Sequence, residues 1–301
     1  MRYRVRHDTA YHYASEVVHS HQLLHLVPRP APYQECIEHA IEFTPATLRR
    51  IDGVDAFGNP MTRVEFEHPH RALTVTSRML VTVHPRPHIR ASDTVPWEQA
   101  RAELTYRGGR SPARATLEAS RFRHESPYVR IKRAFTEFGG ECFGAGRPIL
   151  ECAESLMAKL HGELRYVPGA TTVATPLSEV LADRRGVCQD FAHLMIACLR
   201  SRGLAARYVS GYVRSATPQS KEREPAAPVG AGASHAWIAV FCEPLGWVEL
   251  DPTNNVRVGT DHVAIAWGRD FGDVSPLRGI ILGGGTHQLA VSVAVEPLTR
   301  S

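Results

Sequence analysis

The stretch "GVCQDFAHLMIACLRSRG", residues 186–203, places a cysteine at the start of a predicted amphipathic helix. Its apolar side chains recur at i, i+3, i+4, i+7 and i+8, the stripe of a helix that packs on a core. These positions are Phe191, Leu194, Met195, Cys198 and Leu199. Gly203 suits the residue that follows a helix C-terminus. We therefore predict a helix over this stretch, with the Cys188 thiol at its N-terminus.

A cysteine in this position is suited to nucleophilic chemistry. The unpaired N–H groups and the dipole of a helix N-terminus stabilise a thiolate. The thiolate also needs a base, and a third group that orients the base. His235 opens the predicted strand "HAWIAVFC", and Asp251 closes the predicted strand "GWVELD". In an antiparallel pair the start of one strand lies beside the end of the next, so we predict that Cys188, His235 and Asp251 meet at one edge of a sheet.

The chain as a whole is organised in three parts. Residues 1–85 alternate apolar and polar side chains as strands do, most clearly in "ALTVTSRMLVTV" at 72–83, and "DAFGNP" at 55–60 is a turn signal. We predict an N-terminal β module over 1–85, a connecting and helical segment over 86–145, and a catalytic domain with C-terminal strands over 146–301.

Helices and strands are segregated along the second half of the chain. Helix signals start at Ser126-Pro127, at Pro148 and at Thr175-Pro176, before the helix that Cys188 opens. Strand candidates follow, the last being "HQLAVSVAVE". This order favours an α+β fold over an alternating βαβ fold. We predict an antiparallel β-sandwich-like module, followed by a domain in which the cysteine-bearing helix packs on an antiparallel sheet that bears the histidine and the aspartate.

The composition argues against several classes of protein. Of 301 residues, 22% are charged and 43% are hydrophobic, and no apolar run reaches the roughly 20 residues of a membrane-spanning helix. The net charge of +4 comes from scattered arginines, so nucleic acid is not an expected partner. The six cysteines form no C-x-x-C pair, which favours reduced thiols. The start "MRYRVRHD" differs from a secretory signal, and we expect a cytoplasmic protein that does not bind membranes.

Three motifs occur in a fixed order: a glycine-cysteine helix start, a His-Ala-Trp strand and an Asp-Pro-Thr turn. They lie in "RRGVCQDFAHLMIACLRSRGLAARYVSGY", "SHAWIAVF" and "GWVELDPTNN", within residues 184–255. In these motifs the sequence resembles the transglutaminase-like superfamily, specifically its bacterial branch with an N-terminal β module. Residues 1–85 and "GRDFGDVSPLRG" at 268–279 look like the first module and the tail of that branch. The resemblance implies a papain-like core, with Cys188 as nucleophile, His235 as general base and then acid, and Asp251 orienting the histidine.

The expected reaction is acyl transfer from a peptide or carboxamide bond through a thioester, with water as the favoured acceptor. This predicts a cysteine protease or amidase acting on a peptide or protein. The alternative is a protein-glutamine amine transferase. Large eukaryotic transglutaminases carry extra β-sandwich domains and calcium sites, and the sequence indicates neither, which favours hydrolysis. Two other hypotheses remain open: a non-catalytic module that binds peptides or proteins, and a zinc site made by Cys188, His235 and Asp251.

Other residues are candidates for contact with the substrate: Asp190, Tyr212, Trp237 and Trp247. Asp190 also suits the first turn of the helix, and large aromatic side chains in strands are usually core residues. The backbone N–H of Cys188 is the expected first donor to the oxyanion. No cofactor and no metal ion are expected.

Two further segments carry functional hypotheses: a histidine-rich strand and a Pro-, Ala- and Gly-rich stretch. In "HSHQLLH" the side chains of His19, His21 and His25 share the parity of one strand, which would suit a metal ion. No acidic or cysteine ligand accompanies them at a diagnostic spacing, so we do not predict a site there. The Pro-, Ala- and Gly-rich residues 215–234 end at His235, and we predict a loop that borders the active-site cleft and controls access to it.

Overall fold

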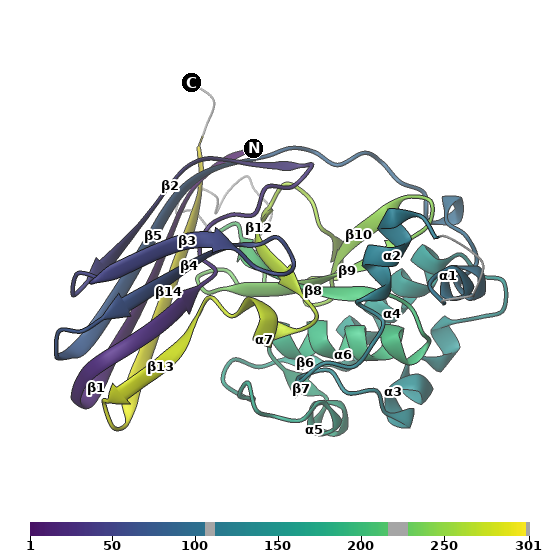
Figure 1. The fold of residues 1–301 in the computed structure, drawn as a ribbon. Coiled ribbons are helices and arrows are strands. Elements are labelled where there is room, and N and C mark those ends of the chain that lie inside the picture. The colour runs from purple at the N-terminus through teal and green to yellow at the C-terminus, as the bar shows by residue number, and fades with distance from the viewer. Residues whose placement is uncertain (106–111, 216–227, 299–301) are drawn as a thin grey trace, which may run out of the picture.

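The computed structural model describes residues 1–105, 112–215 and 228–298, which form two lobes (Figure 1). One lobe is a seven-stranded sheet, and the other packs helices on a five-stranded sheet. The predicted α+β class, with a β module followed by a helix-on-sheet domain, is confirmed. Within the described ranges, no helix is both long enough and apolar enough to cross a membrane.

The seven-stranded sheet is built around one long strand. Its members are β1 (Arg2–Leu24), β2 (Gln34–Thr44), β3 (Arg49–Val54), β4 (Pro60–Phe66), β5 (His70–Val83), β13 (Leu277–Gly283) and β14 (His287–Leu298). The first half of β1 lies between β5 and β14, and its second half lies between β4 and β13. Its pairing with β5 shifts register between His12 and Val17, where the strand exchanges neighbours.

The alternation in β5 buries the predicted face. Leu73, Val75, Met79, Val81 and Val83 are all buried. Leu73 and Val75 belong to a core inside the β module, whereas the other three join the main core that the helices share. β5 therefore contributes side chains to two cores, one inside the first sheet and one shared with the helices.

The C-terminal strands belong to the first sheet, whereas the sequence grouped them with the catalytic domain. β13 pairs with β1 from Leu24 opposite Leu277 to Val17 opposite Gly283. β14 pairs with β1 from Arg2 opposite Leu298 onwards. Alternation identifies a strand but not its partner, and β1 has a free edge that these strands cover.

Short helices follow the first sheet in the chain and lie in the second lobe (Figure 1): η1 (Ala91–Asp93), α1 (Trp97–Glu103), α2 (Arg114–Ser120), α3 (Arg133–Phe138) and η2 (Gly140–Cys142). The helix expected from Ser126-Pro127 begins only at Arg133. Ser126 and Val129 instead exchange both backbone hydrogen bonds, of 3.0 and 3.1 Å. The N–H of Tyr128 donates to the Asp270 carboxylate at 2.9 Å. A hydrogen bond to the distant Asp270 therefore holds Tyr128 outside a helix, although Ser126-Pro127 is a helix-start signal.

The second lobe contains the helix that begins at Cys188. Its elements are α4 (Ile149–Glu163), β6 (Arg165–Tyr166), α5 (Leu177–Asp183), β7 (Arg185–Gly186), α6 (Cys188–Ser201), β8 (Ala206–Val213), β9 (His235–Cys242), β10 (Gly246–Asp251), β11 (Val256–Arg257), β12 (His262–Gly268) and α7 (Phe271–Val274). The sheet order is β11-β10-β9-β8-β12, with every neighbouring pair antiparallel. α6 lies against β8 and β9, with α3, α4 and α5 also in contact with it (Figure 1).

Because helices cover α6 on the sides that the sheet leaves free, residues 190–200 are all buried. This includes Arg200, whose guanidinium donates to the carbonyls of Phe122 at 2.9 Å, Ala206 at 2.9 Å and Arg269 at 2.6 Å. The buried charge is therefore surrounded by backbone acceptors, as a buried polar group requires.

Side-chain amides of the β module satisfy the free edge of β12. Gln34 donates to the carbonyl of Ala264 at 2.7 Å and accepts from the N–H of the same residue at 2.8 Å. Asn59 does the same with Trp267, at 2.8 and 2.9 Å. Each amide takes the place of a neighbouring strand, so the edge is covered and the lobes are joined.

Candidate active site

Several strand ends meet at one edge of the five-stranded sheet. His235 is the first residue of β9 and pairs with Gly211 near the end of β8. Asp251 is the last residue of β10, and His262 is the first of β12, opposite Val213. Antiparallel pairing produces this arrangement, because the start of each strand lies beside the end of its neighbour.

His235 and Asp251 form a buried pair. The distance from His235 Nε2 to Asp251 Oδ2 is 2.8 Å, and both side chains are 0% exposed. Burial alone would lower the pKa of His235, but hydrogen bonding to Asp251 and to Cys188 outweighs it and raises that pKa. Nδ1 has no hydrogen-bond partner of ordinary geometry among the described residues. Because Nε2 is occupied by Asp251, Nδ1 is the nitrogen left available for the interaction of His235 with Cys188.

The Asp251 carboxylate is the centre of a hydrogen-bond network. Oδ2 accepts from His235, from His262 Nε2 at 3.1 Å and from Asn254 Nδ2 at 2.7 Å. Oδ1 accepts from the backbone N–H groups of Thr253 at 3.0 Å and Asn254 at 3.2 Å. Burial acts to raise the pKa of Asp251, but the hydrogen bonds from the two histidines hold it well below its usual range. The carboxylate is therefore ionised and positioned to stabilise an imidazolium.

Cys188 is half-buried and is the first residue of α6, so its backbone N–H has no partner within the helix. Asp190 fixes this helix start: its carboxylate accepts from the Val187 N–H at 2.8 Å and from Thr171 Oγ1 at 2.5 Å. Burial raises the pKa of Asp190 against these two hydrogen bonds. The structure therefore gives Asp190 the helix-start role that the sequence offered as the alternative to substrate contact.

A short segment before β9 lies against the His235 ring. Gly230 has φ +94°, and a Cβ added there would be 2.4 Å from His235 Nδ1. The Asn254 side chain holds the neighbouring Val229 by both backbone groups, at 2.7 Å to the N–H and 3.2 Å to the carbonyl. Of the predicted access loop 215–234, residues 216–227 lie outside the described residues.

The three aromatic candidates lie in packed positions. Trp237 is fully buried and donates from Nε1 to Glu249 at 3.1 Å. The Tyr212 hydroxyl is 2.7 Å from His7 Nδ1, so this side chain is directed at the β module. Trp247 lies near the start of β10, at the opposite end of that strand from Asp251. The structure thus brings Cys188, His235 and Asp251 together and packs Trp237 against the rings of His235 and His262, at centroid distances of 6.1 and 5.2 Å. Tyr212 and Trp247 are directed elsewhere.

Sequence reasoning missed three residues around the site: His262, Asn254 and Tyr166. His262 opens its strand as His235 does, and that shared position was the available signal. Tyr166 is half-buried on β6, and burial, with a smaller electrostatic effect of the nearby Cys188, raises its pKa. The described groups of side chains that could hold a metal ion include His235, Asp251 and His262, but none of those groups contains Cys188.

Comparison with known proteins agrees with this fold. Residues 3–82 match the family described as the bacterial transglutaminase-like N-terminal region, and residues 137–252 match the transglutaminase-like superfamily. An uncharacterized protein of Mycobacterium tuberculosis is 38% identical over 304 residues, covering 98% of this chain and 93% of that protein. A protein-glutamine gamma-glutamyltransferase of Pseudomonas aeruginosa is 32% identical over 113 residues, covering 34% of this chain and 16% of that protein.

A solved structure shares the whole architecture. It is that of a "putative cysteine protease" from Cytophaga hutchinsonii, with a TM-score of 0.72 and 18% identity, covering 100% of this chain and 92% of that one. Both lobes are therefore shared with it as a fold. The chain belongs to the transglutaminase-like superfamily, in the branch that carries the bacterial N-terminal region.

Proposed function

We propose that this protein is a cysteine hydrolase that cleaves peptide or carboxamide bonds through a thioester on Cys188. The observation that carries the proposal is the buried His235–Asp251 pair, whose histidine also interacts with Cys188 at a helix N-terminus. An ionised Asp251 stabilises the imidazolium of His235, and the imidazolium in turn stabilises the thiolate. An interaction module has no need of all three groups, which argues against the purely binding role.

The reaction proceeds in two balanced steps. The Cys188 sulfur attacks the carbonyl carbon, and His235 gives its proton to the leaving amine as the C–N bond breaks. Water then gives a proton to His235 and attacks the thioester, so that a carboxylic acid leaves and the thiol is restored. Asp251 holds the imidazole in one orientation through both steps.

The oxyanion formed in each step needs fixed donors. The backbone N–H of Cys188 is one, because it opens α6. We propose the hydroxyl of Tyr166 as the second, because Tyr166 on β6 is the register partner of Gly186, two residues before Cys188. Tyr166→Phe keeps the ring and removes the donor, so it should lower kcat on the order of 10²-fold. Alkylation of Cys188 forms no oxyanion and should keep its rate, which separates this role from a structural one.

The direct test is alkylation by iodoacetamide near pH 6, followed by intact-mass analysis. An ordinary thiol is mostly protonated there and reacts slowly. We expect one fast adduct, absent in Cys188→Ala and slowed in His235→Ala. Cys36→Ala is the matched control, because Cys36 is also a half-buried free cysteine and its thiol pKa is raised by burial. Uniformly slow labelling of a folded sample would contradict the proposal and favour the binding module.

The second candidate function is amine transfer to a protein glutamine. The matching segment of the Pseudomonas transferase is the observation that favours it. Glutamine-containing peptides incubated with and without a primary amine separate the two. If the peptide is converted to the free acid in the same amount with or without the amine, the result supports hydrolysis. If added amine produces an amide and less acid forms, the result supports transfer.

We also propose that the enzyme acts in the cytoplasm. All six cysteines are free, which suits a reducing compartment. Fractionation of cells that produce the full chain tests this, and recovery from the periplasmic or membrane fraction would contradict it.

A further inference from the structure

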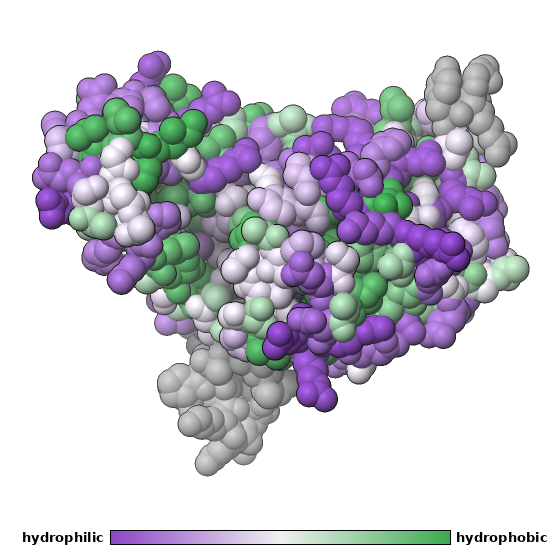
Figure 2. Space-filling view, turned by 90° about the horizontal axis from the view of Figure 1, so that it is seen from below, coloured by the Kyte–Doolittle hydropathy of each residue, from purple (hydrophilic) through white to green (hydrophobic). Residues whose placement is uncertain are grey.

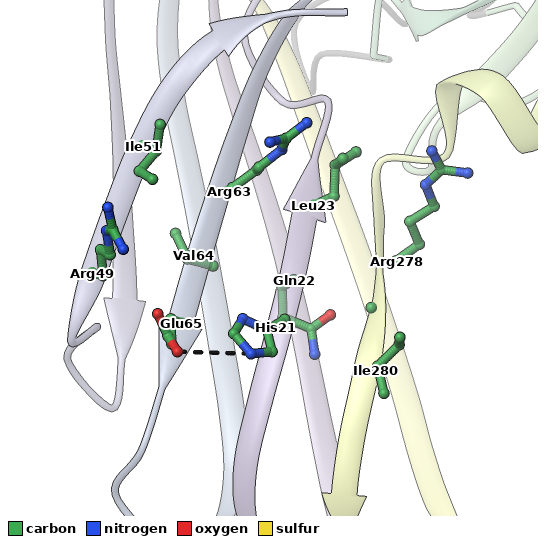
Figure 3. A pocket seen from close by; sticks show the side chains of 11 residues that line it. His21, Gln22, Leu23, Arg49, Ile51, Arg63, Val64, Glu65, Arg278 and Ile280 are labelled. Atoms are coloured by element: carbon green, nitrogen blue, oxygen red, sulfur yellow. Dashed lines mark ion pairs between the residues drawn. The ribbon is translucent and has the colours of Figure 1, made fainter.

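Three side chains of metal-ligand type converge on the β module, in a different lobe from Cys188. His19 and His21 are two residues apart on β1, so they share one face, and Glu65 of β4 is the register partner of His21. His19 Nε2 and His21 Nε2 are 2.9 Å apart. Glu65 Oε1 lies 3.6 Å from the first and 3.7 Å from the second. Figure 3 shows His21 and Glu65 directed at one another from neighbouring strands.

These three atoms have the separations that a metal ion imposes on its ligands. A triangle with these sides has its centre about 2.0 Å from every corner, and zinc binds nitrogen and oxygen at about 2.0–2.2 Å. An ion at or just above that centre would therefore contact all three atoms without movement of the strands. The fourth tetrahedral position would face solvent, since the His21 side chain is 61% exposed.

Hydrogen bonding alone accounts for the cluster poorly. At 2.9 Å the two imidazoles share at most one proton between their Nε2 atoms. The carboxylate oxygen is too far from either nitrogen for a hydrogen bond, at 3.6 and 3.7 Å. A cation at the centre would satisfy two nitrogen lone pairs and one carboxylate together.

The sequence anticipated a different partner for the two histidines. His25 shares their parity, but β1 ends at Leu24 and the His25 side chain is buried, with Asp55 3.2 Å from its Nε2. Glu65 replaces it as the third group. This acidic ligand is far from the histidines in sequence, so spacing alone could not identify it.

We propose that His19, His21 and Glu65 bind one Zn²⁺ ion, which links β1 to β4. Two imidazoles and one carboxylate suit zinc, whereas calcium and magnesium prefer all-oxygen sites. The site borders a groove of about 530 Å³ between β1, β3, β4 and β13 (Figure 3), in which Ile51 and Ile280 are exposed. Figure 2 shows that hydrophobic side chains gather on this lobe. This site does not depend on the proposed chemistry of Cys188.

The test is titration with ZnCl₂ by calorimetry, on the full chain without a histidine tag. A Cys188→Ala background removes the thiol that could bind zinc elsewhere. We expect one equivalent of zinc to bind, and His19→Ala, His21→Ala and Glu65→Gln each to weaken it by at least about tenfold. His12→Ala is the matched control, because His12 is an exposed histidine of the same strand, and it should leave the affinity unchanged.

The melting temperature gives a second, independent measurement of zinc binding. Zinc should raise the melting temperature of the Cys188→Ala protein and not that of the His19→Ala/His21→Ala variant, while both melt alike without metal. Failure to bind zinc, or binding that survives all three ligand substitutions, would overturn the proposal. The second outcome would place the ion elsewhere, with the buried His235, Asp251 and His262 as the next candidates.

Discussion

Gly230 lies against the imidazole of His235 in a backbone conformation that L side chains rarely adopt, with φ +94°. Gly232 has φ +91°, but nothing lies within 4 Å of the position of its Cβ. Alanine at either site should strain the backbone by about 1–3 kcal/mol. Only Gly230→Ala places a methyl group at His235 Nδ1, so we predict that it slows Cys188 alkylation at least about tenfold while Gly232→Ala does not. Second-order labelling rates and thermal unfolding of both variants check this, and equal rates would contradict it.

His262 acts on His235 through the shared Asp251 carboxylate, so it is a positioning residue. Its hydrogen bond helps to hold the pKa of Asp251 low. Without that donor the pKa of Asp251 rises, and the carboxylate is protonated at a higher pH than before. We predict that His262→Leu moves the acid limb of the Cys188 labelling rate to higher pH, and that His262→Asn, which can still donate, moves it less. A lower plateau with an unmoved acid limb would indicate a purely structural role.

The sequence predicted the meeting of Cys188, His235 and Asp251 because each lies at the end of an element with clear periodicity. Antiparallel pairing then brings these ends together. His262 and Asn254 could not be found in this way. A single polar residue at a strand start or in a turn is common, and only the folded chain shows that both donate to Asp251.

At the scale of elements, β12 depends on two amides from the other lobe. Gln34 satisfies both backbone groups of Ala264, which are buried with it. We predict that Gln34→Ala lowers the free energy of unfolding by about 1–3 kcal/mol, because it leaves a buried donor and a buried acceptor unpaired. Gln288→Ala, at an exposed position of β14, should change it by less than about 0.5 kcal/mol. Urea unfolding measures the free energy of unfolding of both variants. Equal losses in Gln34→Ala and Gln288→Ala would contradict the interpretation that Gln34 satisfies the edge of β12.

The elements themselves were predictable where local pattern dominates. α6 begins at Cys188 and β5 buries its predicted face. Local pattern failed where a distant group decides the conformation. The Asp270 carboxylate holds Tyr128 outside a helix, and β1 accepts β13 and β14 as neighbours although more than 250 residues separate them in sequence from its start.

Across the whole molecule, the last strand of the β module reaches the segment that precedes His235. The Val293 N–H of β14 donates to the Gly232 carbonyl at 3.0 Å, and Ser215 donates to the Val295 carbonyl at 3.1 Å. Ser215 and Gly232 are thus both hydrogen-bonded to β14. The first sheet is therefore hydrogen-bonded to a residue only three positions before His235, which links the two lobes next to the candidate active site.

The lobes also share a buried histidine that makes stability depend on pH. His7 Nδ1 is 2.7 Å from the Tyr212 hydroxyl of the other lobe. Burial lowers the pKa of His7 to about 4 and that of His193 to about 3. Both are neutral in the folded state, whereas the unfolded chain takes up their protons near pH 6.5. The free energy of unfolding therefore falls as the pH drops below about 6.5, by up to about 1.4 kcal/mol per pH unit for each histidine.

The buried pair of His235 and Asp251 does not produce this dependence of stability on pH. The pKa of His235 is raised, so its contribution is complete below about pH 6.5 and is lost only as the pH rises through the folded value. The pKa of Asp251 is lowered, so its contribution is lost only below the usual carboxylate range. We predict that His7→Gln reduces the slope between about pH 6 and pH 5 by close to one proton, while His12→Gln, at an exposed site on the same strand, leaves it unchanged. Urea unfolding across that range measures the slope. If His7→Gln leaves the slope unchanged, His7 is already protonated in the folded protein. Its Nδ1–H would then donate the hydrogen bond, and the Tyr212 hydroxyl would accept it.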